Sequence, residues 1–382
     1  MPQRSKSELK KALLGFEPDP ACPKPHCWGE HHIGLSDEEL AALPPYAIFL
    51  AFVTFSGFPY RGRSEKIAWT IPVLFRDVPY VLEHQKFGFH VYPLSSSATP
   101  KLDQELIGQL KRAVHLVDDL IQPLANDQVK KGNVTFRNRQ SMFRYMYTFL
   151  CNKATDAYAA TPPPSEPICS ADGHIVGWKS YPLQPEFDGF VLAASALDAY
   201  FSWLEHILVL LLPFAAFSVG RDDIIRFLAL PWAAKFKRIF NLTTDRDAEK
   251  AFRCLNALRR SLRNPLYHGG IDEGARHILH FRMNDIGAIP LSVSRHRDSI
   301  HYSLVPIPSK SFKNICEMLD DVDEFLRGGV MRLGMKFAEA DLNVAFDANS
   351  IAQYHSAMRS DEAMEELMEA TTCANGEATN MD

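Results

Sequence analysis

A proline-rich segment divides this sequence into two parts of different character, and that division most constrains the fold. Residues Thr161 to Pro167 include four prolines, and a polar turn around Asp172-Gly173 follows them. Proline lacks a backbone N–H and fixes φ, so such a run continues neither a helix nor a central strand. We therefore predict a linker over residues 161–186 that joins two domains.

The part before the linker mixes strand and helix patterns. Residues Tyr46 to Tyr92 are rich in Phe, Tyr, Val and Ile and are interrupted by glycine and proline, which predicts three or four strands. Apolar residues recur at helical spacing from Leu102 to Leu124 and from Gln140 to Tyr158. We expect an α+β domain over residues 1–160.

The part after the linker is mainly helical. Helical spacing predicts helices over about 188–213, 221–240, 245–264 and 309–326, the third of them capped by Thr244. Three strand-like segments predict a small β insertion at about 277–307. We assign this domain to residues 187–345. Residues 346–382 carry no Lys or Arg after Arg359, so we expect an acidic, mostly disordered tail with at most a short helix near 361–370.

The composition excludes several classes of protein. A net charge of -5 over 382 residues argues against general coating of nucleic acid or of an anionic membrane. The most apolar run, Ile207 to Phe217, is about half the length of a membrane span, so we predict a buried helix and no membrane. The start of the chain lacks the apolar core of a signal peptide, and seven cysteines without a repeated spacing fit a reducing compartment. We expect a cytoplasmic protein.

A polar stripe interrupts the apolar surface of the predicted helix 188–213. Ser195, Asp198, Ser202 and Glu205 share one helical face. Buried carboxylates need partners, and arginines of the third predicted helix can supply them. Two interpretations stay open for Asp198 and Glu205: a structural ion-pair network, or support for a catalytic arginine.

Basic residues concentrate in the second and third predicted helices. Between Arg226 and Arg263 there are ten Lys or Arg against three acids, a local net charge of +7. Such a patch suits a phosphate backbone, although a charged run is also typical of a solvated helix face. The residues predicted to bind RNA are Lys235, Lys237, Arg238, Arg253, Arg259 and Arg260.

An arginine and a histidine follow one another where the third predicted helix ends. An arginine can hold a phosphate and a histidine can transfer a proton, so Arg263 and His268 form a candidate pair for cleaving a phosphodiester. In an unbroken helix these two side chains point about 140° apart. Pro265 and Gly269-Gly270 favour a bend that turns the imidazole back.

The segment Arg263-Asn264-Pro265-Leu266-Tyr267-His268 resembles the R-x4-6-H ribonuclease motif of the HEPN superfamily, including the polar residue after the arginine. The resemblance covers about residues 187–326 and implies an HEPN-like helical bundle that cleaves RNA as a homodimer without metal or cofactor. It implies His268 as general base or acid, Arg263 as stabiliser of phosphate charge, and Asn264 as an orienting group.

The superfamily serves widely in bacterial toxin–antitoxin and antiphage systems, so the resemblance also implies a defence role. The resemblance does not extend to residues 1–160, which we expect to form a sensing or partner-binding domain for a regulatory or trigger protein. Superfamily members that are silenced by nucleotidylation carry a tyrosine two residues after the histidine. This chain has Gly270 at that position, so we do not expect this form of regulation here. We expect Tyr267 to stack on a base or to pack.

Three alternatives accompany this hypothesis. One is a non-catalytic HEPN-like module that dimerises and binds RNA or protein; a second gives Arg263 and His268 structural roles. The third concerns a weak zinc site in an N-terminal loop that lacks paired C-x2-C spacing. Its candidate ligands are Cys22, Cys27, His31 and His32, with His26 among them. Phosphate-binding glycine loops, nucleophile elbows and H-E-x-x-H helices are absent from the sequence.

Overall fold

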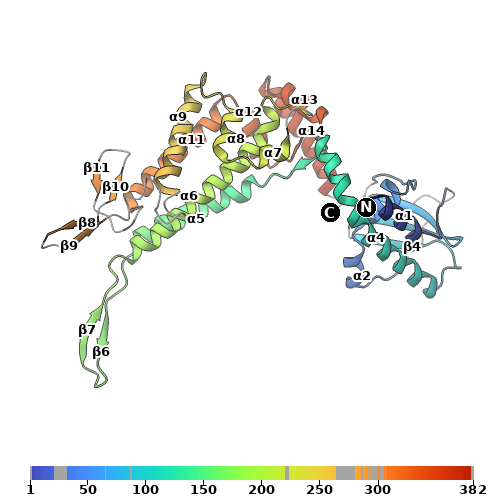
Figure 1. Ribbon diagram of the computed structural model, residues 1–382, viewed down its shortest axis with the longest axis horizontal. Helices are drawn as coiled ribbons and strands as arrows, with labels where there is room; N and C mark the ends of the chain where they lie inside the picture. The colour runs from blue at the N-terminus through green and yellow to red at the C-terminus, as the bar shows by residue number, and fades with distance from the viewer. Residues whose placement is uncertain are drawn as a thin grey trace. The chain divides into compact units, whose positions relative to one another are not determined.

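The chain forms two compact units in the computed structural model (Figure 1). Residues 1–131 and 369–382 make up the N-terminal unit, and residues 132–368 make up the helical unit. The structure describes residues 2–20, 32–64, 66–86, 88–219, 223–263, 280–284, 287–290, 292–294, 299–301, 305 and 307–379.

The N-terminal unit contains a four-stranded antiparallel sheet in the order β1-β2-β3-β4. Its strands are β1 (Phe16–Pro18), β2 (Ile67–Phe75), β3 (Val78–Gln85) and β4 (Gly88–Pro93). Arg76 and Asp77 connect β2 to β3 with φ values of 50° and 64°. Two positive φ values in a two-residue connection match a type I′ turn, whose twist fits that of the flanking strands.

One face of this sheet packs against helices in a single apolar cluster. Alternate strand residues such as Ile71, Val73, Leu82 and Val91 are buried there, as the two-residue period of a strand requires. The covering elements are α1 (Pro2–Ala12), α3 (Pro45–Phe49), η2 (Leu50–Thr54) and α4 (Pro100–Lys130). A short helix, α2 (Asp37–Ala42), precedes α3. The predicted α+β pattern of this region is therefore confirmed, but residues 46–54, which were predicted to contribute to the strands, are helical.

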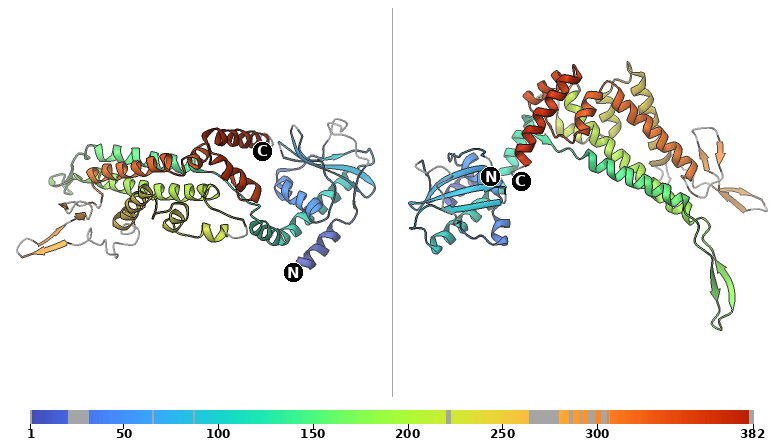
Figure 2. Two further views of the ribbon diagram at one scale, coloured as in Figure 1. Left: turned by 90° about the horizontal axis from the view of Figure 1, so that it is seen from above. Right: turned by 180° about the vertical axis from the view of Figure 1, so that it is seen from behind.

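The helical unit is built around two long antiparallel helices, α5 (Gln140–Ala159) and α6 (Gln184–Leu211), which lie side by side (Figure 2). Gly189 allows their close approach, because a Cβ at this position would lie 2.4 Å from the ring of Tyr158. Helix α6 with the following turn η3 (Leu212–Phe214) is long and apolar enough to span a membrane. However, 83% of its most apolar window is buried within the fold, as in the central helix of a helical core.

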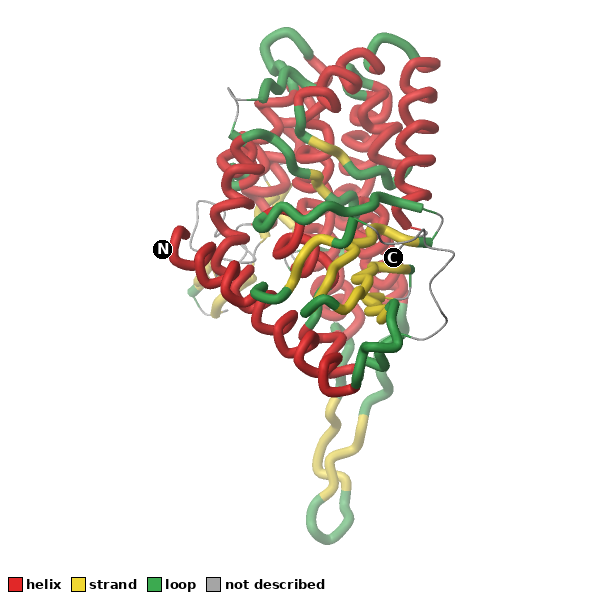
Figure 3. Tube along the Cα trace, turned by 90° about the vertical axis from the view of Figure 1, so that its right-hand side faces the viewer, coloured by secondary structure: helices red, strands yellow, loops and turns green. Residues whose placement is uncertain are grey.

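A β-hairpin joins these two helices (Figure 3). It consists of β6 (Glu166–Cys169) and β7 (Ile175–Lys179), and its residues are exposed almost throughout. The predicted linker is thus a connection inside the helical unit. The division between the units falls at residue 131 instead of 160, because α5 packs along α6.

The helical unit also contains further helices. They are α7 (Ile224–Leu228), α8 (Trp232–Ile239), α9 (Arg246–Leu258), α11 (Ser309–Gly328) and α12 (Arg332–Glu339). The single helix predicted over 221–240 is divided by Pro231, which precedes α8 and caps it without a side-chain hydrogen bond. Helix α11 packs against α9 and α6, and α12 packs against α6.

Short antiparallel strand pairs complete the helical unit. The pairs are β8 (His280–Met283) with β9 (Gly287–Pro290), β10 (Ser292–Ser294) with β11 (Ser299–His301), and β5 (Thr135–Phe136) with β12 (Val344–Ala345). The first two pairs confirm strands in the predicted β insertion.

The acidic tail differs from the expectation of disorder, because two helices occupy most of residues 348–379. Helix α13 (Ala348–Ala357) is capped by Asp347, whose carboxylate accepts from two backbone N–H groups, and it buries Ile351 and Tyr354. Helix α14 (Asp361–Thr379) starts beside α12. There Arg332 lies 2.7 Å from the Asp361 carboxylate, and Lys336 pairs with Glu365 at 2.6 Å. Counting charge along the sequence misses these cross-helix partners.

Candidate nucleic-acid interface

Helix α9 carries the predicted basic region and has one buried face. Asp245, not Thr244, caps it: its carboxylate accepts from the Ala248 N–H at 2.9 Å. The buried face is formed by Ala248, Ala251, Leu255 and Leu258, at the spacing of an amphipathic helix. The helix continues into a π-helical turn, η4 (Arg259–Arg263). The chain thus remains helical as far as the first residue of the predicted motif.

The opposite face of α9 presents a row of exposed cations, which we call the basic stripe. It consists of Arg246, Lys250, Arg253 and Arg260, at spacings of about one or two turns. Arg253 lies 3.8 Å from Glu249, an exposed pair that holds its guanidinium only weakly. The cations of the basic stripe are therefore exposed to solvent and accessible to a ligand. Arg259, beside it, is partly buried.

The basic residues of α8 do not form one surface. Lys235 is buried, with its Nζ 3.1 Å from the Glu205 carboxylate of α6. Lys237 places its Nζ 5.0 Å from the centre of the Phe252 ring, and Arg238 donates to the Ala216 carbonyl at 2.9 Å. Lys235 is therefore removed from the cations that can contact RNA, a correction to the sequence-based prediction.

The polar stripe of α6 has partners other than those predicted. Glu205 takes its cation from α8, through Lys235, instead of from the arginines that follow α9. The Ser195 hydroxyl donates to the Val191 carbonyl at 2.9 Å, and the Ser202 hydroxyl donates to the Asp198 carbonyl at 3.0 Å. Asp198 itself is half-buried on this face. These local bonds favour the structural interpretation of the stripe.

The motif itself extends beyond the described residues. The backbone of Arg263 ends η4, whereas Asn264, Tyr267 and His268 lie outside the part of the chain that the structure describes. The candidate zinc ligands Cys22, His26, Cys27 and His31 also lie outside it. His32 is described, with its ring centre 5.3 Å from that of His90. Among the described residues, no group of three or more His, Cys, Asp or Glu is arranged to hold a metal.

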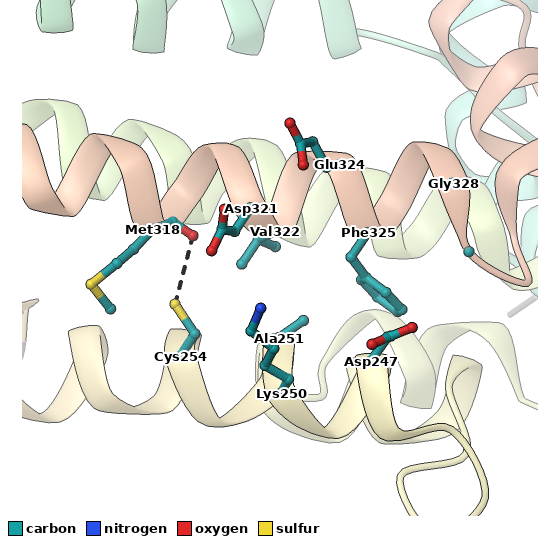
Figure 4. Close-up of a pocket in the computed structure, with 11 residues that line it drawn as sticks. Asp247, Lys250, Ala251, Cys254, Met318, Asp321, Val322, Glu324, Phe325 and Gly328 are labelled. Atoms are coloured by element: carbon teal, nitrogen blue, oxygen red, sulfur yellow. Dashed lines mark hydrogen bonds between the residues drawn. The ribbon is translucent and has the colours of Figure 1, made fainter.

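A groove of about 300 Å³ lies between α9 and α11, and Lys250 is the member of the basic stripe that lines it (Figure 4). Lys250 and Asp247 line it from α9, and Asp321 lines it from α11. Cys254 donates from its thiol to the Met318 carbonyl at 3.7 Å. Burial, and then the charge of Asp321, raises the pKa of Cys254 to about 11, so this thiol is a poor nucleophile at neutral pH. The groove is an open depression of mixed charge.

Sequence reasoning missed a buried ionic cluster that connects three helices. Arg144 of α5 lies 2.5 Å from the Asp323 carboxylate of α11, and the Tyr200 hydroxyl of α6 donates to the same carboxylate at 2.9 Å. The Arg144 guanidinium also lies 5.1 Å from the centre of the Tyr147 ring and 5.0 Å from that of Trp203. A signal existed: Asp323 stands among the apolar residues that α11 buries.

Burial, the largest influence, raises the pKa of Asp323, while Arg144 and Tyr200 oppose that effect. The cluster positions α5, α6 and α11 around the core.

Comparison of the chain with protein-family models, with curated proteins and with solved structures gives no match.

Proposed function

We propose that this protein is an HEPN-like, metal-independent endoribonuclease that acts on RNA as a homodimer, in a bacterial toxin or antiphage system of the cytoplasm. The observation that carries the proposal is the basic stripe, which runs along α9 directly into the turn that ends at Arg263. A row of cations that leads to a motif able to move a proton is an arrangement suited to a phosphodiester.

The geometry of α9 supports an extended polyanion as the ligand. From Arg246 to Arg260 the axis advances about 21 Å at 1.5 Å per residue. A stripe of this length can contact several phosphates of one RNA strand, each contact releasing counterions. The rest of the chain is acidic on balance, so this surface is distinct within a net charge of -5.

The proposed chemistry needs only groups of the motif. His268 removes the proton from a ribose 2′-hydroxyl, the 2′-oxygen attacks the adjacent phosphorus, and the bond from phosphorus to the 5′-oxygen breaks. The leaving oxygen takes a proton, and the products are a 2′,3′-cyclic phosphate and a 5′-hydroxyl. Arg263 stabilises the negative charge on the phosphate in the transition state, and Asn264 orients it.

An exposed apolar surface supports the dimer. Of the 18 large apolar side chains that are exposed in the described part of the chain, 11 lie between Met142 and Val191. Met142, Tyr145, Met146 and Phe149 share one face of α5. Apolar groups concentrated in this way are typical of an interaction surface.

In this proposal the N-terminal unit binds a regulatory or trigger protein.

Cleavage of a fluorescent RNA in the presence of EDTA tests the proposal. Arg263→Ala and His268→Ala should each lower the cleavage rate by at least about a hundredfold, as loss of a general base or of charge stabilisation does. The exposed residues Arg112 and His115 of α4 supply matched controls, since Arg112→Ala and His115→Ala should cleave normally. Full cleavage by the His268→Ala variant would exclude the proposed mechanism.

A second function is favoured by the same stripe, because exposed cations bind RNA whether or not a histidine follows. In that case the protein is a non-catalytic module that binds RNA. It would then bind RNA without cleaving it, and Arg253→Ala with Arg260→Ala would weaken binding while His268→Ala would not. Product analysis by mass spectrometry separates the two functions, since only cleavage yields a cyclic phosphate.

A further inference from the structure

Helices α5 and α11 run antiparallel, and residues at corresponding positions of the two helices contact each other. Arg144 of α5 pairs with Asp323 of α11. Cys151 lies seven residues further along α5 and Cys316 seven residues back along α11, and a hydrogen bond between their thiols is the largest influence on the pKa of each. Seven residues are about two helical turns, so both pairs use the same two facing surfaces.

The register continues beyond the thiols. The ring centres of Tyr158 on α5 and Phe312 on α11 lie 5.8 Å apart, one to two turns past the cysteines. The two cysteines therefore lie between the ion pair of Arg144 and Asp323 and the ring contact of Tyr158 and Phe312. Both cysteines are unpaired and only partly buried, which leaves a path for a small reagent.

We propose that Cys151 and Cys316 form a peroxide-sensitive dithiol, whose oxidation to a disulfide joins α5 to α11. The ion pair of Arg144 and Asp323 on one side and the ring contact of Tyr158 and Phe312 on the other place the two cysteines on facing surfaces of α5 and α11. The proposal concerns the helical unit alone and does not depend on the proposed RNA cleavage.

The surroundings assign different roles to the two cysteines. The pKa of Cys151 is lowered by the hydrogen bond from the Cys316 thiol, with further help from the Tyr147 hydroxyl and the Arg144 charge, against burial and Asp320. The pKa of Cys316 is raised, first by its hydrogen bond to Cys151 and then by burial. The thiolate is the nucleophile, so Cys151 attacks the peroxide and Cys316 resolves the product.

The two steps balance without another reagent. The Cys151 thiolate attacks one oxygen of hydrogen peroxide, the O–O bond breaks, and a sulfenic acid and hydroxide form. The sulfur of Cys316 then attacks the Cys151 sulfur, and the hydroxyl group leaves as water after taking a proton. Two thiols and one peroxide thus give one disulfide and two waters.

Peptide mapping of the full-length protein after treatment with hydrogen peroxide tests the proposal. A peptide pair linked through Cys151 and Cys316 should form, with the loss of two hydrogen atoms, and dithiothreitol should remove the link. Cys254 is the matched control within the same unit, because burial keeps its thiol protonated. Oxidation that occurs first at the exposed Cys169 or Cys373, with Cys151 and Cys316 still reduced, would overturn the proposal.

Two conservative variants separate the roles. In Cys316→Ser the sulfur of Cys151 should gain one or two oxygen atoms, because the resolving thiol is gone. In Cys151→Ser, Cys316 should stay reduced, and Cys254→Ser should form the disulfide at the wild-type rate. The oxidised wild type should unfold at a temperature several degrees higher than the reduced form, since the link closes a long loop. Equal oxidation of the remaining thiol, Cys151 in Cys316→Ser and Cys316 in Cys151→Ser, would contradict the assigned roles.

Discussion

Arg144 and Asp323 form an ion pair in which the acid is almost fully buried. Their nearest nitrogen and oxygen atoms are 2.5 Å apart, and the side chain of Asp323 is 3% exposed against 27% for Arg144. The pair joins α5 to α11, and Tyr200 adds α6 through its hydroxyl. Removing one partner would leave the other charge unpaired in a region of low polarity.

Replacing Asp323 should therefore destabilise the helical unit strongly. We expect Asp323→Ala to lower the free energy of unfolding by about 3–5 kcal/mol, the usual cost of breaking a buried pair. Urea unfolding followed by circular dichroism measures this change. The exposed pair of Arg332 and Asp361 is the control, and Arg332→Ala should have a far smaller effect. Equal losses in the two variants would contradict the role given to Asp323.

His206 should make the stability depend on pH. Its Nε2 accepts the Arg139 backbone N–H at 2.9 Å, which requires a neutral ring, and burial, followed by the Arg139 charge, lowers its pKa to about 4. The unfolded chain binds a proton below the ordinary value of about 6.5, whereas the folded chain does not until about 4. This contribution to stability is complete above pH 6.5 and is lost as the pH falls from 6.5 to about 4, by on the order of 2 kcal/mol once solvent screening of the partly exposed ring is included.

Unfolding of wild type and of His206→Gln across this pH range tests the idea. The variant keeps a group that can accept the Arg139 N–H, but it does not titrate. Its stability should therefore fall less between pH 6.5 and 4 than that of the wild type. If the two curves stay parallel, His206 does not carry the pH dependence.

Much of the fold follows from residue patterns in the sequence. The apolar spacing of α6, α9 and α11 is regular over many turns, so their approximate positions were predictable. The domain boundary was not, because prolines show where a helix stops and not which neighbour it packs against. The prolines near Pro163 end α5, yet the chain turns back and places α6 on it.

The candidate site was predictable in part. Exposure separates Arg253 and Arg260, which lie on the surface of α9, from Lys235, which is buried beside Glu205. A count of charges along the sequence treats all three alike, because it does not include the neighbouring helix. The link between Arg144 and Asp323 spans 179 positions of the sequence, and local spacing does not reveal such a pairing.

Gly189 should tolerate no side chain, because α5 passes close to it. A Cβ there would lie 2.4 Å from the Tyr158 ring, so Gly189→Ala must displace one helix or the ring. We expect a loss of about 1–3 kcal/mol in the free energy of unfolding, as in other overpacked cores. Gly108 of α4 is the control: nothing lies within 4 Å of a Cβ at that position. Gly108→Ala should be neutral or stabilise by up to about 1 kcal/mol, because alanine favours helix.

RNA binding by the basic stripe should depend on salt in a way that counts its contacts. Fluorescence anisotropy with a single-stranded RNA, in a His268→Ala background that prevents cleavage, gives the affinity at several salt concentrations. Each lost phosphate contact lowers the slope of log affinity against log salt by about 0.7. Arg253→Ala with Arg260→Ala should therefore lower the magnitude of the slope by about 1.4.

Lys235→Met is the matched control for this measurement, since it removes a cation of the same sequence region. The Lys235 ammonium is buried against Glu205 and has no route to a phosphate, so the salt slope should remain that of the parent protein. A slope that falls in Lys235→Met by about half as much as in the arginine variant, one charge against two, would show that net charge, and not the exposed face of α9, determines binding. An unchanged slope in both would place the RNA-binding surface elsewhere on the protein.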